Sequence, residues 1–166
     1  PAARSGWAGG PPRHDVLMDR TAPTPPANAL APDLPEDIAR EAIAFRRRLH
    51  GHPELDLHLP RTQAAVLERL EALRAEAGED AATGRPALET SVGRALSSVV
   101  VVLRGGAPLP EGARRPVVLL RGDMDALPVT EETGLEYAPS VPGTMHACGH
   151  DLHTAGLYGA LAWLVR

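Results

Sequence analysis

The spacing of apolar side chains predicts two amphipathic helices in the first part of the folded region. The first begins after Asp33, a suitable N-cap, and ends near Gly51, since Pro53 disfavours helical geometry in the residue before it. The second begins near Thr62 and stops at Gly78, because glycine commonly terminates helices. The apolar positions that define these faces are Leu34, Ile38, Ala42, Phe45 and Leu49 in the first helix and Val66, Leu70 and Leu73 in the second.

Two short apolar runs, at residues 98–103 and 116–120, predict strands that are buried on both faces. The connection between them, residues 104–115, is too short and too rich in Gly and Pro to hold a crossover helix. We therefore expect the two strands to be antiparallel neighbours. Residues 78–93, which precede the first run, are expected to form a loop.

A third helix is predicted after Asp151, which can cap it, with Leu157, Leu161 and Leu164 as its apolar positions. Helices, then strands, then a further helix indicate an α/β layered architecture. This fold class is expected for residues 33–166.

Residues 1–32 differ from the rest of the chain in composition. Eight of the seventeen prolines lie between Pro1 and Pro35, where large apolar side chains are few. Such a segment cannot bury enough apolar surface to order itself. We expect residues 1–32 to be a flexible, Pro/Ala/Gly-rich (disordered) extension.

Charge and cysteine content exclude several classes of protein. The formal net charge is −4 and the basic residues form no stripe that could neutralise phosphates, so a nucleic-acid partner is not expected. No run approaches the about 18 consecutive apolar residues of a membrane span, so no membrane association is expected. Cys148 is the only cysteine, which rules out an internal disulfide and fits a reducing compartment. We therefore expect a cytoplasmic protein.

The segment around Cys148 concentrates residues that can bind a metal ion. It holds the only cysteine, three of the seven histidines and an aspartate. A thiolate at Cys148 and an imidazole at His150 can converge on one zinc-like ion, since Gly149 between them carries no side chain. Asp151 could orient an imidazole, as metal-ligating histidines usually require. His146 belongs to the same cluster.

Asp123 and Asp125 directly follow the second predicted strand. Ligands of open α/β sheets bind beyond the strand ends, so carboxylates at this point stand where a site would form. Both aspartates share one side of an extended chain, because side chains on a strand alternate between its two faces. The alternative interpretation is that they cap a turn before Pro128.

Other interpretations of the cysteine and the histidines stay open on spacing alone. Cys148 could be an inert buried thiol or a redox-active one, and the histidines could simply pack around a helix start. A closed structural zinc site is disfavoured, because there is no second cysteine. His50 and His52 lie at a predicted helix C-terminus, which attracts cationic side chains, so a structural role is favoured for them.

Three motifs occur along the chain in the order found in one family of hydrolases. They are His50-Gly51-His52-Pro53-Glu54-Leu55, Arg121-Gly122-Asp123-Met124-Asp125-Ala126-Leu127-Pro128 and Met145-His146-Ala147-Cys148-Gly149-His150-Asp151. Together they resemble the M20 family of metallo-amidohydrolases, in its aminoacylase, hippurate hydrolase and auxin-conjugate hydrolase branch. The resemblance covers roughly residues 35–166. It implies a zinc-peptidase-like catalytic domain, of which residues 33–166 are the N-terminal portion.

The resemblance also implies a function. It predicts a site with two divalent metal ions, of Mn, Zn, Co or Ni, that hydrolyses the amide bond of small N-acyl amino acids. Cys148 and His150 correspond to metal ligands, with Cys148 at the position that often bridges the metals. The residues expected beside the ligands or the substrate are Asp123, Asp125, His146 and Asp151.

Part of the family's site has no counterpart in this chain. The general base of the family is a Glu in a Glu-Glu pair downstream of the Cys-Gly-His motif, and we expect it to lie beyond Arg166. No catalytic residue is therefore assigned within the chain, which is expected to be inactive or nearly so alone. The family's smaller inserted domain commonly mediates dimerisation, so a homo-oligomeric parent protein is expected. The alternative is a non-enzymatic remnant or binding module that keeps the fold.

Overall fold

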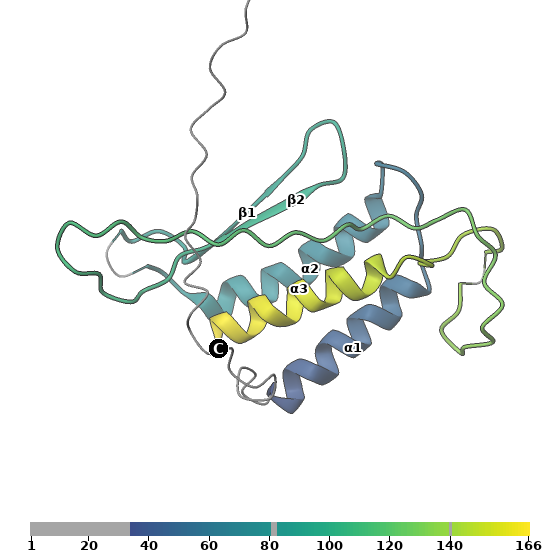
Figure 1. The fold of residues 1–166 in the computed structure, drawn as a ribbon, viewed down its shortest axis with the longest axis horizontal. Coiled ribbons are helices and arrows are strands. Elements are labelled where there is room, and N and C mark those ends of the chain that lie inside the picture. The colour runs from purple at the N-terminus through teal and green to yellow at the C-terminus, as the bar shows by residue number, and fades with distance from the viewer. Residues whose placement is uncertain (1–33, 81–82, 140) are drawn as a thin grey trace, which may run out of the picture. The chain divides into compact units, whose positions relative to one another are not determined.

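A computed structural model describes residues 34–80, 83–139 and 141–166, which lie in one unit spanning Leu34–Arg166. The elements in the described residues are the helices α1 (Glu36–His50), α2 (Pro60–Ala77) and α3 (His150–Val165) and the strands β1 (Leu88–Val92) and β2 (Val99–Leu103) (Figure 1). This mixture of helices and strands confirms the α/β prediction. The expected extension over residues 1–32 and the expected cap at Asp33 lie outside the described residues. None of these helices is both long and apolar enough to cross a bilayer.

The first two helices form where the apolar spacing predicts them. Phe45 and Leu49 of α1 are buried, as are Leu70 and Leu73 of α2. The α1 helix ends at Gly51, whose N–H donates to the carbonyl of Arg47 at 3.1 Å. The end of α2 at Gly78 is also as predicted. Local signals therefore determine the length and the buried face of both helices.

The buried face of α3 differs from the prediction. Leu164 is 69% exposed, and the residues that α3 buries are mostly small. The α3 helix lies between α1 and α2 (Figure 1). A Cβ built on Gly159 would lie 3.6 Å from the Cβ of Ala42 on α1, an ordinary van der Waals contact. Small residues of α3 therefore pack directly against α1 at this point.

The prediction places one strand correctly but is wrong about its partner and about its burial on both faces, since Val100 and Val102 of the observed strand are 55% and 43% exposed. β2 occupies residues 99–103, but it pairs antiparallel with β1, inside the region expected to be a loop. Leu88 of β1 faces Leu103 of β2, and Leu88 is fully buried against the core. A hairpin that joins neighbouring segments needs little loop-closure entropy, which favours this partner over a more distant one. The hairpin packs against α2.

The second predicted strand does not form. Residues 116–120 are not assigned to any strand, and Val117, Val118, Leu119 and Leu120 are 92%, 82%, 89% and 59% exposed. An apolar run without polar alternation requires cover on both faces. Within the described residues neither face of this run is covered, which is why its hydrophobicity does not lead to a strand.

Short bridges around Ala126 hold together the segments that carry the candidate site. The N–H of Ala126 donates to the carbonyl of Glu54 at 2.7 Å, in a parallel bridge beside Leu55. Leu127 and Met145 exchange two backbone hydrogen bonds, of 2.9 Å and 3.0 Å. The chain after α1, the aspartate segment and the start of the cysteine segment are therefore neighbours in space.

Candidate metal centre

A tight turn presents Cys148 immediately before α3. The N–H of Gly149 donates to the carbonyl of His146 at 3.1 Å, so Cys148 lies at the tip of the turn with its side chain exposed. Gly149 has φ of 82°, in the left-handed region that side chains disfavour. The residue type that the turn requires therefore stands between the two expected ligands, and His150 starts the helix directly after it.

The imidazole of His150 is held by Asp125. Its Nδ1 lies 2.9 Å from the carboxylate Oδ1 of Asp125 and 2.9 Å from the carbonyl oxygen of the same residue. Since both of these oxygens are acceptors, Nδ1 carries the proton and Nε2 is the nitrogen with a free lone pair. A histidine fixed by a carboxylate in this way is typical of metal ligands.

Close packing of the aspartate segment on α3 makes this contact possible. A Cβ on Gly122 would lie 2.8 Å from Cδ1 of Leu157 and 3.3 Å from the Cβ of His153. The hydroxyl of Thr154 also donates to the carbonyl of Asp123 at 3.1 Å. Glycine at this position lets the backbone approach the helix, which brings Asp125 to His150.

The two aspartates of the motif have different partners. The carboxylate of Asp125 faces His150, whereas that of Asp123 accepts a hydrogen bond of 2.8 Å from exposed Arg121. The structure therefore brings Asp125, but not the carboxylate of Asp123, to an expected ligand. The turn-capping interpretation does not describe Asp125, because its carboxylate contacts an imidazole on α3.

Asp151 and His146 are buried, with 1% and 5% of their surface exposed. Asp151 does not cap α3, and it orients the imidazole of His50 instead of that of His150: its Oδ2 lies 2.8 Å from Nδ1 of His50. Neither ring nitrogen of His146 has a hydrogen-bond partner among the described residues. Burial lowers the pKa of His146, and the neighbouring charge of Asp151 opposes this effect.

The sequence did not predict the contacts that His50 makes with distant residues. A structural role at the end of α1 describes His52, whose Nδ1 donates to the carbonyl of Arg48 at 2.9 Å. His50 instead contacts Asp151 and, through Nε2, Glu131 at 2.9 Å. Glu131 carried no signal in the sequence, since it lies 81 residues from His50. The only available signal for His50 was its place in the first of the three motifs.

The residues present suit a metal ion but do not enclose one. Cys148 and His150 supply sulfur and nitrogen, the donors that zinc-like ions prefer. In the part of the chain that the structure describes, no three side chains of His, Cys, Asp or Glu are grouped so that they could hold a metal ion. The pair therefore fits part of a metal centre.

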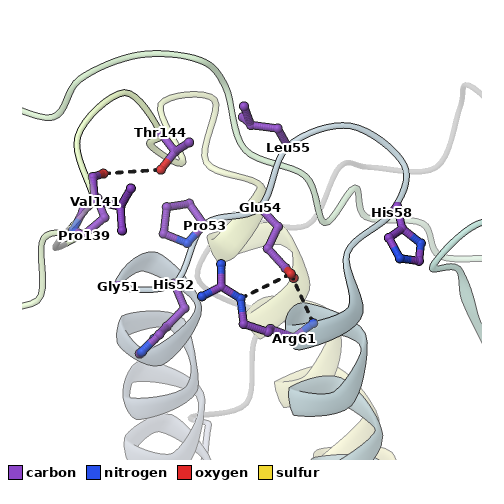
Figure 2. A pocket seen from close by; sticks show the side chains of 10 residues that line it. All are labelled: Gly51, His52, Pro53, Glu54, Leu55, His58, Arg61, Pro139, Val141 and Thr144. Carbon is purple, nitrogen blue, oxygen red and sulfur yellow. Dashed lines mark hydrogen bonds and ion pairs between the residues drawn. The ribbon is translucent and has the colours of Figure 1, made fainter.

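A separate pocket of about 340 Å³ opens beside the chain that follows α1 (Figure 2). Its lining includes His52, Glu54 and Arg61, and it includes neither Cys148 nor His150. The pocket is therefore distinct from the candidate metal centre. Figure 2 shows that Glu54 points across it toward Arg61 at the start of α2.

Glu54 caps α2 from outside the helix. Its Oε2 accepts hydrogen bonds from the backbone N–H and the hydroxyl of Thr62, at 2.7 Å and 2.8 Å, and its Oε1 accepts from Arg61. Burial acts to raise the pKa of Glu54, but the hydrogen bonds from Thr62 and Arg61 outweigh it and lower the pKa below its ordinary value. The ionised carboxylate thus satisfies N–H groups that a helix start leaves unpaired.

Replacing Glu54 by Gln is expected to lower the free energy of unfolding by about 1 kcal/mol at pH 7. Because folding lowers the pKa of Glu54, its contribution is complete above the unfolded pKa of about 4.3 and is lost as the pH falls through the folded pKa. Urea unfolding of both proteins between pH 7 and pH 3 measures this. The control is Glu71→Gln, which removes an exposed charge on α2 itself. A difference that persists unchanged at the lowest pH would contradict the capping role.

Comparison with known proteins identifies the family. Residues 119–166 match the sequence model of peptidase family M20/M25/M40. These residues are similar to this family. The matched residues include the aspartate motif, the turn at Cys148 and all of α3, so the M20 resemblance of the sequence is confirmed.

Individual M20 relatives extend the match to most of the chain. An N-acyl-L-amino acid amidohydrolase of Geobacillus stearothermophilus is 39% identical over 126 residues, which are 76% of this chain and 29% of the relative. Thermostable carboxypeptidase 1 of Saccharolobus solfataricus is 40% identical over 124 residues, 75% of this chain and 27% of the relative. Both of these relatives are hydrolases.

A solved M20 structure shows the same fold. YXEP of Bacillus subtilis, described as a dinuclear metal-binding peptidase of the M20 family, matches with a TM-score of 0.62 and 33% identity. The match covers 78% of this chain and 31% of YXEP. The chain therefore has the fold of an M20 hydrolase over its described part, and it spans about a third or less of the length of these relatives.

Proposed function

We propose that this chain contributes Cys148 and His150 as ligands of a divalent metal centre that hydrolyses the amide bond of N-acyl amino acids. The contact between Asp125 and His150 carries the proposal, because it fixes the imidazole and leaves Nε2 for a metal. A divalent metal held there would supply Lewis-acid activation of the amide carbonyl and of a water molecule. The thiolate and imidazole pair suits Zn²⁺ or Co²⁺ better than Mg²⁺.

The chain's own residues have separate roles in this proposal. Gly149 allows the turn that exposes the Cys148 thiol. Asp125 accepts a hydrogen bond from Nδ1–H of His150 and keeps the ring in one orientation. Asp123, whose carboxylate faces Arg121, acts only through its backbone, which accepts the hydrogen bond from Thr154 on α3.

The substrate class rests on the relatives. An N-acyl-L-amino acid amidohydrolase and an N-acetyl-L-cysteine deacetylase of Bacillus subtilis are 39% and 38% identical to the matched part of this chain. The chain spans 29% and 26% of these two proteins. The pocket for the acyl group and for the side chain of the substrate amino acid is therefore expected to need residues that this chain does not contain. We propose that the chain alone hydrolyses such substrates slowly or not at all.

Metal content tests the ligand assignment. After incubation with Zn²⁺ or Mn²⁺ and removal of free ion, Cys148→Ser and His150→Gln are expected to retain at least about tenfold less metal than the unchanged protein, because each variant removes one donor. His58→Gln, an exposed histidine beside the pocket, is the matched control. Atomic absorption gives the bound metal, and circular dichroism verifies that each variant is folded.

Two outcomes would count against the proposal in different ways. Equal metal content in the unchanged protein and Cys148→Ser would favour a non-enzymatic protein that keeps the fold. Rapid turnover of a panel of N-acyl amino acids by the purified, metal-loaded chain would contradict the expected low activity. It would leave the assignment of Cys148 and His150 as ligands unchanged.

A further inference from the structure

A buried polar network joins the end of α1 to the start of α3. The ring of His50, the last residue of α1, lies between two carboxylates: its Nδ1 is 2.8 Å from Oδ2 of Asp151 and its Nε2 is 2.9 Å from Oε2 of Glu131. The side chains of His50, Asp151 and Glu131 are 3%, 0% and 2% exposed. Both ring nitrogens of His50 therefore contact buried carboxylates, so the imidazole links Asp151 to Glu131.

Arg46 supplies a positive charge to the network, and its NH2 group also lies 3.2 Å from Nδ1 of His50. Its Nε lies 2.7 Å from Oδ2 of Asp151, an ion pair in which the N–H direction does not meet hydrogen-bond geometry. Its NH1 group donates to the hydroxyl of Tyr137 at 2.9 Å. The Arg46 guanidinium thus compensates the charge of the Asp151 carboxylate, as a buried charge requires.

Glu131 is fixed from its other side. The hydroxyl of Thr133 donates to its second carboxylate oxygen. Burial acts to raise the pKa of Glu131, but the hydrogen bonds from Thr133 and His50 outweigh it and lower that pKa. The carboxylate therefore stays ionised as the anchor of the network in the loop that follows the aspartate motif.

The network acts on the helix start that carries the expected ligand. Asp151 directly follows His150 in the first turn of α3. No side chain in the described residues caps this helix, and the buried carboxylate of Asp151 is one of the contacts that hold its first turn. Asp125 holds the imidazole of His150, and the network holds the backbone from which that imidazole projects.

We propose that His50 is a positioning residue for the metal centre, which it affects by joining Asp151 to Glu131 and so fixing the start of α3. This inference rests on the proposed function, since it treats His150 as a ligand. His50 itself acts through Asp151. Metal sites require their ligands to be held within about 0.5 Å of the productive geometry, so small shifts of a helix start are sufficient to weaken binding.

Two substitutions of His50 separate its two hydrogen bonds. In His50→Asn the amide nitrogen can take the place of Nδ1 and keep the contact with Asp151, while the contact with Glu131 is lost. In His50→Gln the longer side chain can take the place of Nε2 and keep the contact with Glu131, while the contact with Asp151 is lost. Each variant is titrated with Co²⁺, and the absorption from thiolate-to-cobalt charge transfer at Cys148 is followed. His50→Gln is expected to weaken Co²⁺ binding by about 10- to 100-fold, as loss of an outer partner does, and His50→Asn by less.

Controls separate positioning from folding. Glu68→Gln on α2 removes an exposed ion pair with Arg48 of α1 and is expected to leave Co²⁺ affinity unchanged. Circular dichroism and urea unfolding report the folded fraction, and Glu131→Gln, which keeps the shape of the side chain, replaces His50→Gln if that variant does not fold. It is also expected to weaken Co²⁺ binding.

The outcomes distinguish this inference from the ligand assignment. Unchanged Co²⁺ affinity in folded His50→Gln, beside a cobalt spectrum that Cys148→Ser abolishes, would overturn the role of His50 and leave the ligands in place. A purely structural role would lower the unfolding midpoint without changing the affinity of the folded protein. No Cys148-dependent spectrum in the unchanged chain would overturn both the ligand assignment and the positioning role.

Discussion

Replacing Asp151 by Ala is expected to lower the free energy of unfolding by about 3–5 kcal/mol. The Asp151 side chain is fully buried, and its Oδ2 contacts both His50 and Arg46. Without it, the guanidinium of Arg46 loses its carboxylate, Nδ1 of His50 loses its buried partner, and the first turn of α3 loses one of its contacts. Removing one partner of a buried ion pair costs much more than the pair itself contributes, because the remaining charge is uncompensated.

Urea unfolding followed by circular dichroism measures this loss. Asp151→Asn keeps the shape and one acceptor oxygen, so its loss is expected to be smaller. Asp37→Ala removes an exposed carboxylate that pairs with Arg166 on the surface and is expected to cost less than about 1 kcal/mol. If Asp151→Ala lost as little free energy of unfolding as Asp37→Ala, the network would not contribute to stability.

Local sequence patterns were sufficient for α1 and α2. Both helices show apolar side chains at intervals of three and four, and both end at glycines that the sequence identifies, Gly51 and Gly78. The face of α3 was not predictable in this way. Besides Tyr158, the residues that α3 buries include Ala155, Gly159 and Ala162, and these small residues carry almost no hydrophobic signal.

The apolar run at 116–120 shows what composition cannot determine. Its hydrophobicity correctly indicates a segment that favours burial, but a strand also requires a neighbour for its backbone. β2 finds that neighbour in β1, only a short loop away, and the described residues leave the later run exposed. Pairing partners depend on which segments meet in space, and a list of apolar runs does not contain this information.

In the candidate site too, local features were predictable from the sequence and contacts between distant residues were not. The turn that exposes Cys148 and starts α3 at His150 is a local feature, and Gly149 between them was a recognisable signal. The contact of Asp125 with His150 spans 25 residues, and that of His50 with Asp151 spans 101. The sequence placed Asp151 beside an imidazole without the means to say which one, since residues so far apart meet only after α1 and α3 have packed together.

That packing depends on Phe45, and Phe45→Ala is expected to lower the free energy of unfolding by about 3–5 kcal/mol. Phe45 is 1% exposed and meets the ring of Tyr158 on α3 edge to face, with centroids 5.5 Å apart. The substitution removes this contact and leaves a cavity between α1 and α3, the two helices whose ends carry His50 and His150.

Thermal and urea unfolding measure the loss, with Ile43→Ala as the control on the same helix, because Ile43 is 54% exposed. Phe45→Leu fills most of the cavity and is expected to lose less than Phe45→Ala. If Phe45→Ala cost no more than Ile43→Ala, the contact with Tyr158 would not be what holds α1 on α3. A different contact would then have to hold the His50 end of α1 against α3, since no other aromatic pair joins these helices in the described residues.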